Sequence, residues 1–144
     1  MTKFFSKRTM LSFLEDVFPQ VEGKIEILYL GEDVVSAKLK TTQSDLRPGN
    51  TVSGPSMFLL ADVTFYIAVL ALIGKEPLAV TTNCSINFMR KPDPNDLVAE
   101  ARILKSGRKL IMGVVNLKSD GGSDLVAHAS FTYSIPSQIK NSNK

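Results

Sequence analysis

The sequence predicts a single α+β domain in which an antiparallel sheet of about six strands wraps one long helix. Residues 57–73 form an almost wholly apolar run, broken only by Asp62 and Thr64. Two extended stretches precede this run and four follow it, which is the pattern of strands packed on one helix. An apolar helix has to be covered on nearly every side, and a sheet of this size can cover it. A chain of 144 residues, 44% apolar and 22% charged, is typical of one globular domain with a real core.

The first 22 residues are expected to hold a short amphipathic helix. Leu14 and Phe18 recur at helical spacing within it. Two β-like stretches follow, at 24–30 and 34–39, and the turn residues between them predict a hairpin.

The long helix is expected to begin after a turn-rich loop and to end at Gly74. Ser53 or Gly54 can cap its start, and Pro55 suits its first turn. Its apolar run of about 17 residues is shorter than the roughly 20 of a membrane span and carries an acid, so no membrane is expected as a partner.

Four extended stretches complete the chain, at 78–89, 97–104, 109–118 and 125–135. The first of them alternates and places a polar set of side chains on one face, which suggests that this strand lies where two protomers meet. The two faces are Val80, Thr82, Cys84, Ile86 and Phe88, and Thr81, Asn83, Ser85 and Asn87. The polar tail at 137–144 is expected to fray.

Composition excludes several classes of function. The net charge of +3 suits an anionic ligand, but the chain has no dense Lys/Arg block of the kind that binds nucleic acid. Cys84 is the single cysteine, so no internal disulfide forms, and the sequence lacks a Cys/His set for a metal site. Glu15 and Asp16 interrupt the region where a signal peptide would be apolar, which favours the cytoplasm.

The carboxylate of Asp62 is the candidate functional group that the residues alone provide. An acid inside an apolar helix is costly to bury, so it is either a catalytic group in a dry cleft or a core acid that reaches solvent or a hydrogen-bond partner. Helix physics leaves both alternatives open. The single histidine, His128, has no nucleophile at a recognisable spacing, and Cys84 is expected to be a small buried side chain.

Three motifs, taken in order, resemble a known family. They are the loop and helix start G-N-T-V-S-G-P followed by Leu60-Ala61-Asp62, the strand A-V-T-T-N-C-S-I-N-F-M followed by R-K-P, and the turn L-K-S-G-R followed by a strand. In this order and spacing they resemble hotdog-fold acyl-CoA thioesterases of the phenylacetyl-CoA (PaaI-like) type, over residues 23–136. The resemblance implies one hotdog domain over residues 1–144. It also implies a homo-oligomer, a dimer or a tetramer built as a dimer of dimers, with active sites at the protomer boundary.

The resemblance also implies roles for three residues. Asp62 would act as nucleophile or general base on the thioester of an acyl-CoA, and the backbone N–H of Gly54 would polarise the carbonyl. The hydroxyl of Thr81, contributed across the interface, would help to place the attacking water. No metal or redox cofactor is implied.

One departure from the family pattern leaves alternatives open. Many relatives carry His-Gly-Gly where this chain has Ser53-Gly54-Pro55. The missing histidine allows a non-catalytic acyl-CoA binding protein with a degenerate site. A hotdog hydratase is the third alternative and ranks last, because His128 is on the wrong element.

The remaining candidates concern substrate binding. Basic turn residues are expected to hold the phosphates of coenzyme A, and aromatic side chains near the acid are expected to line an acyl pocket, although both kinds are also common as solvated turns and as core. These candidate substrate-binding residues are Asn50, Ser53, Phe58, Tyr66, Arg90, Lys91, Lys105, Gly107 and Arg108.

Overall fold

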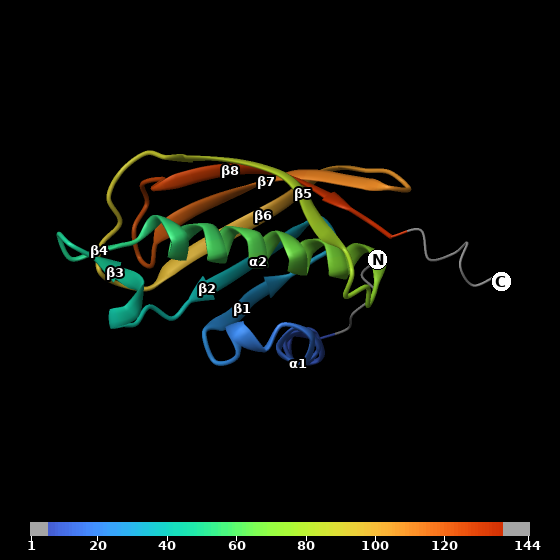
Figure 1. Ribbon diagram of the computed structural model, residues 1–144, viewed down its shortest axis with the longest axis horizontal. Helices are drawn as coiled ribbons and strands as arrows, with labels where there is room; N and C mark the ends of the chain where they lie inside the picture. The colour runs from blue at the N-terminus through green and yellow to red at the C-terminus, as the bar shows by residue number, and fades with distance from the viewer. Residues whose placement is uncertain (1–5, 137–144) are drawn as a thin grey trace.

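A six-stranded antiparallel sheet curves around the long helix α2 in the computed structural model, which describes residues 6–136 (Figure 1). The strand order is β1-β2-β6-β7-β8-β5, and every neighbouring pair is antiparallel. The helices are α1 (Lys7–Val17) and α2 (Gly54–Ile73). The strands of the sheet are β1 (Ile25–Leu30), β2 (Val34–Leu39), β5 (Val80–Phe88), β6 (Leu97–Ser106), β7 (Leu110–Ser119) and β8 (Ala127–Ser134). The expectation for the tail at 137–144 lies outside the described residues.

The predicted fold class is confirmed, including both helices and all six strands. The sequence did not indicate the short elements between β2 and α2, which are a 3₁₀ turn (Gln43–Asp45) and a two-stranded hairpin of β3 (Leu46–Arg47) and β4 (Thr51–Val52). A second 3₁₀ turn (Pro19–Val21) follows α1. Strands of two residues are too short to show a hydrophobic period, so pattern reasoning does not detect them.

Helix α2 begins and ends as its sequence predicts. The side-chain oxygen of Ser53 accepts a hydrogen bond from the backbone N–H of Ser56, and proline occupies the first turn. Gly74 ends the helix with φ of 100°, and its N–H donates to the carbonyl of Leu70 at 2.8 Å. The helix is long and apolar enough to cross a membrane, and its most apolar 18-residue segment has a mean hydropathy of 2.2. Inside the fold, however, 72% of that segment is buried. It therefore has the environment of a core helix.

Strand β5 departs from the regular alternation expected for it. Thr81 lies opposite Tyr133 while Asn83 lies opposite Thr132, so Thr82 is an extra residue in a β-bulge. The bulge moves Thr81 from the polar face onto the face that Cys84 presents to α2, and it leaves Val80 55% exposed. The prediction that Thr81 shares a face with Asn83 is therefore wrong, since a strand keeps its period of two only where no residue is inserted.

One edge of the sheet is formed by β5, which pairs only with β8. A strand of nine residues at an edge presents a long row of unpaired backbone groups, which isolated domains usually avoid. Large apolar side chains are also exposed at its two ends: Leu78, Val80, Phe88 and Met89. This edge therefore has the features of a surface that pairs with another chain.

Candidate active site

Asp62 lies midway along α2 and faces β5 and β8. Its Oδ1 accepts a hydrogen bond from the hydroxyl of Thr81 at 2.6 Å and another from the hydroxyl of Tyr133 at 2.9 Å. The Tyr133 hydroxyl also lies 3.3 Å from the backbone carbonyl oxygen of Asp62. Within residues 6–136 the other carboxylate oxygen, Oδ2, has no hydrogen-bond partner. One oxygen of the acid is thus held by two donors and the other is left for a ligand.

The two donors come from neighbouring strands because Thr81 and Tyr133 are direct cross-strand partners in the β5–β8 pairing. The Tyr133 ring is 3% exposed and stacks on Tyr66 with ring centroids 6.1 Å apart. Burial raises the pKa of Tyr133 far above its ordinary value, and the charge of Asp62 raises it further. Its hydroxyl therefore stays protonated and remains a donor.

A pocket of about 230 Å³ opens beside the carboxylate. Its walls are mainly apolar and aromatic, and they include the C-terminal end of α1 as well as α2, β5 and β8. The lining residues are Val17, Phe18, Asp62, Val63, Tyr66, Pro77, Ala79, Val80, Thr81 and Tyr133. A concave site with aromatic and aliphatic walls and one carboxylate suits the binding of an apolar group next to a reactive centre.

The start of α2 leaves one backbone donor for a ligand. Pro55 has no N–H, the N–H of Ser56 donates to the Ser53 hydroxyl, and the N–H of Met57 donates to the Ser53 carbonyl. Among residues 6–136 no acceptor takes the N–H of Gly54. A free N–H at a helix N-terminus lies in the positive field of the helix and suits a developing oxyanion.

Ser53 does not replace the histidine of relatives as a donor to substrate. Its hydroxyl donates to Ser56 Oγ at 3.2 Å, and Ser56 Oγ donates in turn to Asp45 at 2.7 Å. The single proton of Ser53 is thus used within the protein, so the helix start presents a backbone donor and no side-chain donor in its place.

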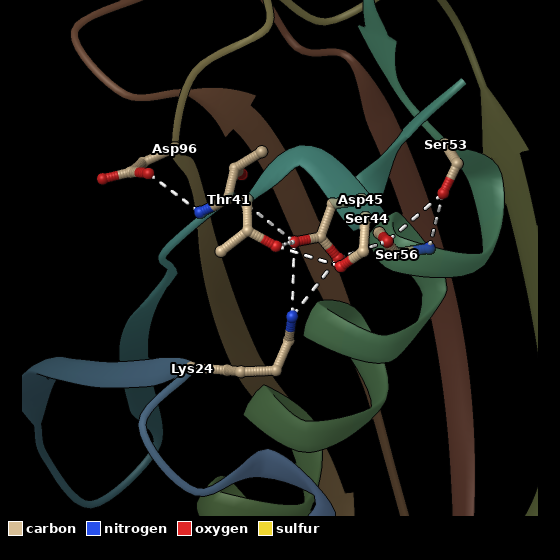
Figure 2. Close-up of polar contacts among 8 residues, drawn as sticks. Lys24, Thr41, Ser44, Asp45, Ser53, Ser56 and Asp96 are labelled. Carbon is tan, nitrogen blue, oxygen red and sulfur yellow. Dashed lines mark hydrogen bonds and ion pairs between the residues drawn. The ribbon is translucent and has the colours of Figure 1, made fainter. Parts of the chain in front are cut away.

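Asp45 is the acid that anchors this end of the helix, and it is only 4% exposed. Figure 2 shows Lys24 approaching it from one side and Ser56 from the first turn of α2. The Lys24 Nζ and the Ser56 Oγ lie 3.2 Å and 2.7 Å from its carboxylate oxygens. The Asp45 carbonyl also accepts the N–H of Ser53 at 2.8 Å. Burial works to raise the pKa of Asp45, but hydrogen bonds from Thr42, Ser56 and Lys24 outweigh it and hold that pKa below its usual value. Asp45 is therefore a charged group that fixes the direction of the α2 N-terminus.

A second pocket, of about 580 Å³, lies over the start of α2. Gly54 lines it together with three cations, Arg47, Arg90 and Lys91. The guanidinium of Arg90 also donates from Nε to the Leu125 carbonyl at 3.0 Å, which holds it at the rim. Positive side chains beside a helix N-terminus suit a ligand that carries phosphate.

The three residues assigned to catalysis do not form one site within a single chain. Gly54 and Asp62 are eight residues apart on α2, which separates them by about 12 Å along the helix. Thr81 contacts the Asp62 of its own chain, whereas the sequence-based expectation had it reaching the acid from a neighbouring protomer. The reason is the bulge in β5, which turns Thr81 inward.

The substrate-binding candidates are dispersed. Tyr66 lines the pocket beside Asp62, and Arg90 and Lys91 line the pocket over Gly54. Asn50 is an exposed turn residue with φ of 58° and lines neither pocket, and Phe58 packs on Phe131 at 6.2 Å without lining either one.

The second basic group comprises Lys105, at the end of β6, and Gly107 and Arg108, in the turn between β6 and β7. The register places this turn near the Val80 end of β5, because Leu110 and Val80 both pair with Ser134. Arg90 and Lys91 follow the opposite end of that strand, roughly 30 Å away for nine residues. One chain therefore does not bring the two basic groups together.

Sequence reasoning missed three residues of these sites: Tyr133, Arg47 and Asp45. Tyr133 had a signal, since an inward-facing tyrosine on an alternating strand needs a partner for its hydroxyl. Arg47 and Asp45 belong to the short hairpin and 3₁₀ turn that no periodicity revealed. Within residues 6–136 no cluster of three or more His, Cys, Asp or Glu side chains is arranged to hold a metal ion.

Comparison with known proteins identifies the family. The model of the thioesterase superfamily matches residues 49–126, which include α2, β5, β6 and β7. A candidate thioesterase from Silicibacter sp. TM1040 is 49% identical over 94% of this chain and 95% of its own, with a TM-score of 0.87. No curated protein sequence gives a significant match.

More distant structures share the fold. A thioesterase from Haemophilus influenzae has a TM-score of 0.82 at 18% identity, covering 94% of this chain and 93% of its own. A point mutant of the phenylacetic acid degradation protein PaaI from Thermus thermophilus has a TM-score of 0.71 at 22% identity, covering 82% and 99%. The chain therefore belongs to the thioesterase superfamily, and it is a thioester hydrolase with the hotdog fold.

Proposed function

We propose that the chain hydrolyses coenzyme A thioesters, with Asp62 as nucleophile or general base. The observation that carries the proposal is the divided carboxylate of Asp62, by which we mean that, among residues 6–136, both hydrogen-bond donors contact one of its oxygens and leave the other free. Thr81 and Tyr133 hold Oδ1, while Oδ2 is left beside the pocket without a hydrogen-bond partner among residues 6–136. An acid kept in such a site is poised to act on a bound group.

A complete site in this proposal takes residues from two copies of the chain. If two β5 edges pair antiparallel about Ser85, with the bulged Thr82 left out of the register, Thr81 of one chain lies opposite Phe88 of the partner subunit. Phe88 packs over Gly54, since a Cβ on that glycine would be 3.6 Å from the Phe88 ring. This pairing would bring the partner's Gly54 toward Asp62. The working unit is then a homodimer with two equivalent sites, alone or within a tetramer built as a dimer of such dimers.

Two routes of hydrolysis fit the divided carboxylate. In the general-base route, Oδ2 takes a proton from water while the water oxygen bonds to the carbonyl carbon. The oxyanion accepts the N–H of Gly54, the C–S bond breaks, and the sulfur receives the proton. In the nucleophilic route, Oδ2 itself bonds to the carbon, the thiolate leaves, and water then hydrolyses the mixed anhydride. Both routes give a free acid and coenzyme A, and neither uses a metal or a redox cofactor.

The two pockets support a division of the substrate. The cations Arg47, Arg90 and Lys91 suit the phosphates of the nucleotide end. The two-fold relation also carries the partner's Lys105, at the end of β6, and the partner's Arg108, in the following turn, to the same end of the joined sheet. The pocket beside Asp62, of about 230 Å³, is the place for the acyl group in this division. The cytoplasm is the proposed location, because coenzyme A esters are made and used there.

The test measures thiol release from short, branched, aromatic and long acyl-CoA esters, with wild type and Asp62→Asn compared side by side. Hydrolysis by the wild type that falls at least about a thousandfold in the folded variant supports the proposal. Full turnover in the variant refutes the role of Asp62. Saturable acyl-CoA binding without hydrolysis by the wild type would favour a binding protein instead. The lack of activity would then be attributed to Ser53, whose hydroxyl donates to Ser56 and not to a substrate. Labelling with ¹⁸O-water in a single turnover identifies the nucleophilic route when water opens the anhydride at the Asp62 carbon, since that course alone leaves an unlabelled product and a labelled Asp62.

A further inference from the structure

We infer that Tyr133 is a positioning residue that fixes the Asp62 carboxylate, together with Thr81, so that only Oδ2 faces the bound thioester. The inference rests on the proposed function of Asp62 and extends it to a residue on β8. Both hydroxyls donate to the same oxygen, at 2.6 Å and 2.9 Å. A carboxylate free to rotate would exchange its two oxygens, whereas two donors on Oδ1 oppose that exchange.

The Tyr133 hydroxyl is itself held in place by its surroundings. The ring packs on Phe65 at 5.3 Å and on Phe131 at 6.5 Å, in addition to its stack on Tyr66. The ring is almost fully buried, so it has little freedom to leave this position. A donor carried by a packed aromatic ring is more rigid than one on a flexible chain.

The second contact of Tyr133 links the acid to its own helix. The hydroxyl lies 2.9 Å from Oδ1 and 3.3 Å from the backbone carbonyl oxygen of Asp62, so one donor contacts both the side chain and the main chain of the same residue. The arrangement limits rotation of the side chain relative to α2. Orienting an attacking group before the reaction lowers the barrier without changing how tightly the substrate binds.

The kinetic test uses Tyr133→Phe, Thr81→Val and the double variant. Tyr133→Phe keeps the ring and its packing, and we expect kcat to fall about tenfold while KM changes less than about twofold. The double variant is expected to lose more than the product of the two single losses, because each hydroxyl partly compensates for the other. Thr64→Val is the matched control. It removes a fully buried hydroxyl that donates to the Leu60 carbonyl at 2.6 Å on the same helix, and it is expected to keep kcat.

An unchanged kcat in Tyr133→Phe would overturn the inference, even if KM rose, because a rise in KM alone reports weaker substrate binding. A fall in kcat of equal size in Thr64→Val would also overturn it, because the effect would then follow from core damage.

A second readout is independent of activity and separates this inference from the proposed function. Tyrosine labelled with ¹³C at Cζ gives a signal for each of the three tyrosines, and Tyr133→Phe identifies the one from Tyr133. Asp62→Asn removes the charge that the hydroxyl faces, so the Tyr133 signal is expected to move while that of the exposed Tyr29 stays in place. If the signal moves but no ester is hydrolysed, the contact holds and the proposed function fails. If the wild type hydrolyses esters but the signal does not move, the positioning role of Tyr133 is refuted.

Discussion

The buried acid Asp45 gives a prediction about stability that can be worked out from its contacts. The change is Asp45→Asn, which keeps the shape and removes the charge. Its carboxylate accepts the Ser56 hydroxyl at 2.7 Å, the Thr42 N–H at 2.9 Å and the Lys24 ammonium at 3.2 Å. In the variant one oxygen becomes an amide donor, so at least one of these buried donors loses its acceptor.

The expected cost follows from counting these bonds. A hydrogen bond to a charged group contributes about 1.5–3 kcal/mol, and the Lys24 side chain is 26% exposed, so much of its share is recovered by water. We therefore expect the free energy of unfolding to fall by about 2–4 kcal/mol at pH 7. For a chain of this length that corresponds to a Tm lower by roughly 6–12 °C.

The direction of the pKa shift of Asp45 determines how this loss of stability depends on pH. The pKa of Asp45 is lowered in the folded protein, so its contribution is present above the unfolded value of about 3.9 and is lost as the pH falls through the folded value. The difference between wild type and Asp45→Asn should therefore be full at pH 6–7 and shrink below about pH 4.

The assay is urea unfolding of both proteins at matched concentration, because oligomers gain stability with concentration. Asp120→Asn is the control. It breaks the more exposed ion pair with Lys38, at 3.0 Å, and should leave the midpoint nearly in place. A difference that is equally large at pH 7 and at pH 3.5, or one below about 0.5 kcal/mol at pH 7, would refute the reasoning.

Three further predictions concern other parts of the fold. Gly113→Ala should destabilise the protein by about 1–3 kcal/mol, because the added Cβ would lie 2.3 Å from the Arg102 carbonyl oxygen and 2.5 Å from the Phe65 ring; an unchanged denaturation midpoint would contradict it. Ser53→Ala removes the N-cap of α2 and should cost about 1 kcal/mol in the same measurement, and a neutral result would mean that the cap is not needed. Cys84 should react with iodoacetamide more slowly than free cysteine at pH 8 and gain rate as the pH rises further, because burial raises the pKa of its thiol; a rate equal to that of free cysteine would show that the strand opens readily.

The sequence predicted the fold well because the strongest signals are long. The apolar run of α2, its Ser53 cap and its Gly74 stop each follow from local chemistry, and the structure confirms them. The strands were recognised because each carries several residues of alternating or β-branched pattern. Elements of two or three residues, such as β3 and β4, carry no such period and were missed.

The candidate site was less predictable, because it depends on register and on contacts between distant segments. Asp62 could be singled out as a charge inside an apolar helix, but nothing local indicates that Tyr133 reaches it across 71 positions of sequence. The inward turn of Thr81 depends on a bulge that regular alternation does not anticipate. The separation of Gly54 from Asp62 follows directly from helix geometry. Because of this separation, we propose that a second chain completes the site.

The extra residue at Thr82 has a consequence for how relatives of this protein should be aligned. Removing Thr82 would restore a regular strand in which Thr81 and Cys84 are two residues apart, so the Thr81 hydroxyl would still face α2. A relative with a single-residue deletion at Thr82 would therefore retain the acid and both of its donors, in a strand without the bulge. An alignment of relatives should therefore allow a one-residue gap at Thr82 before it treats the threonine that bonds to the acid as lost.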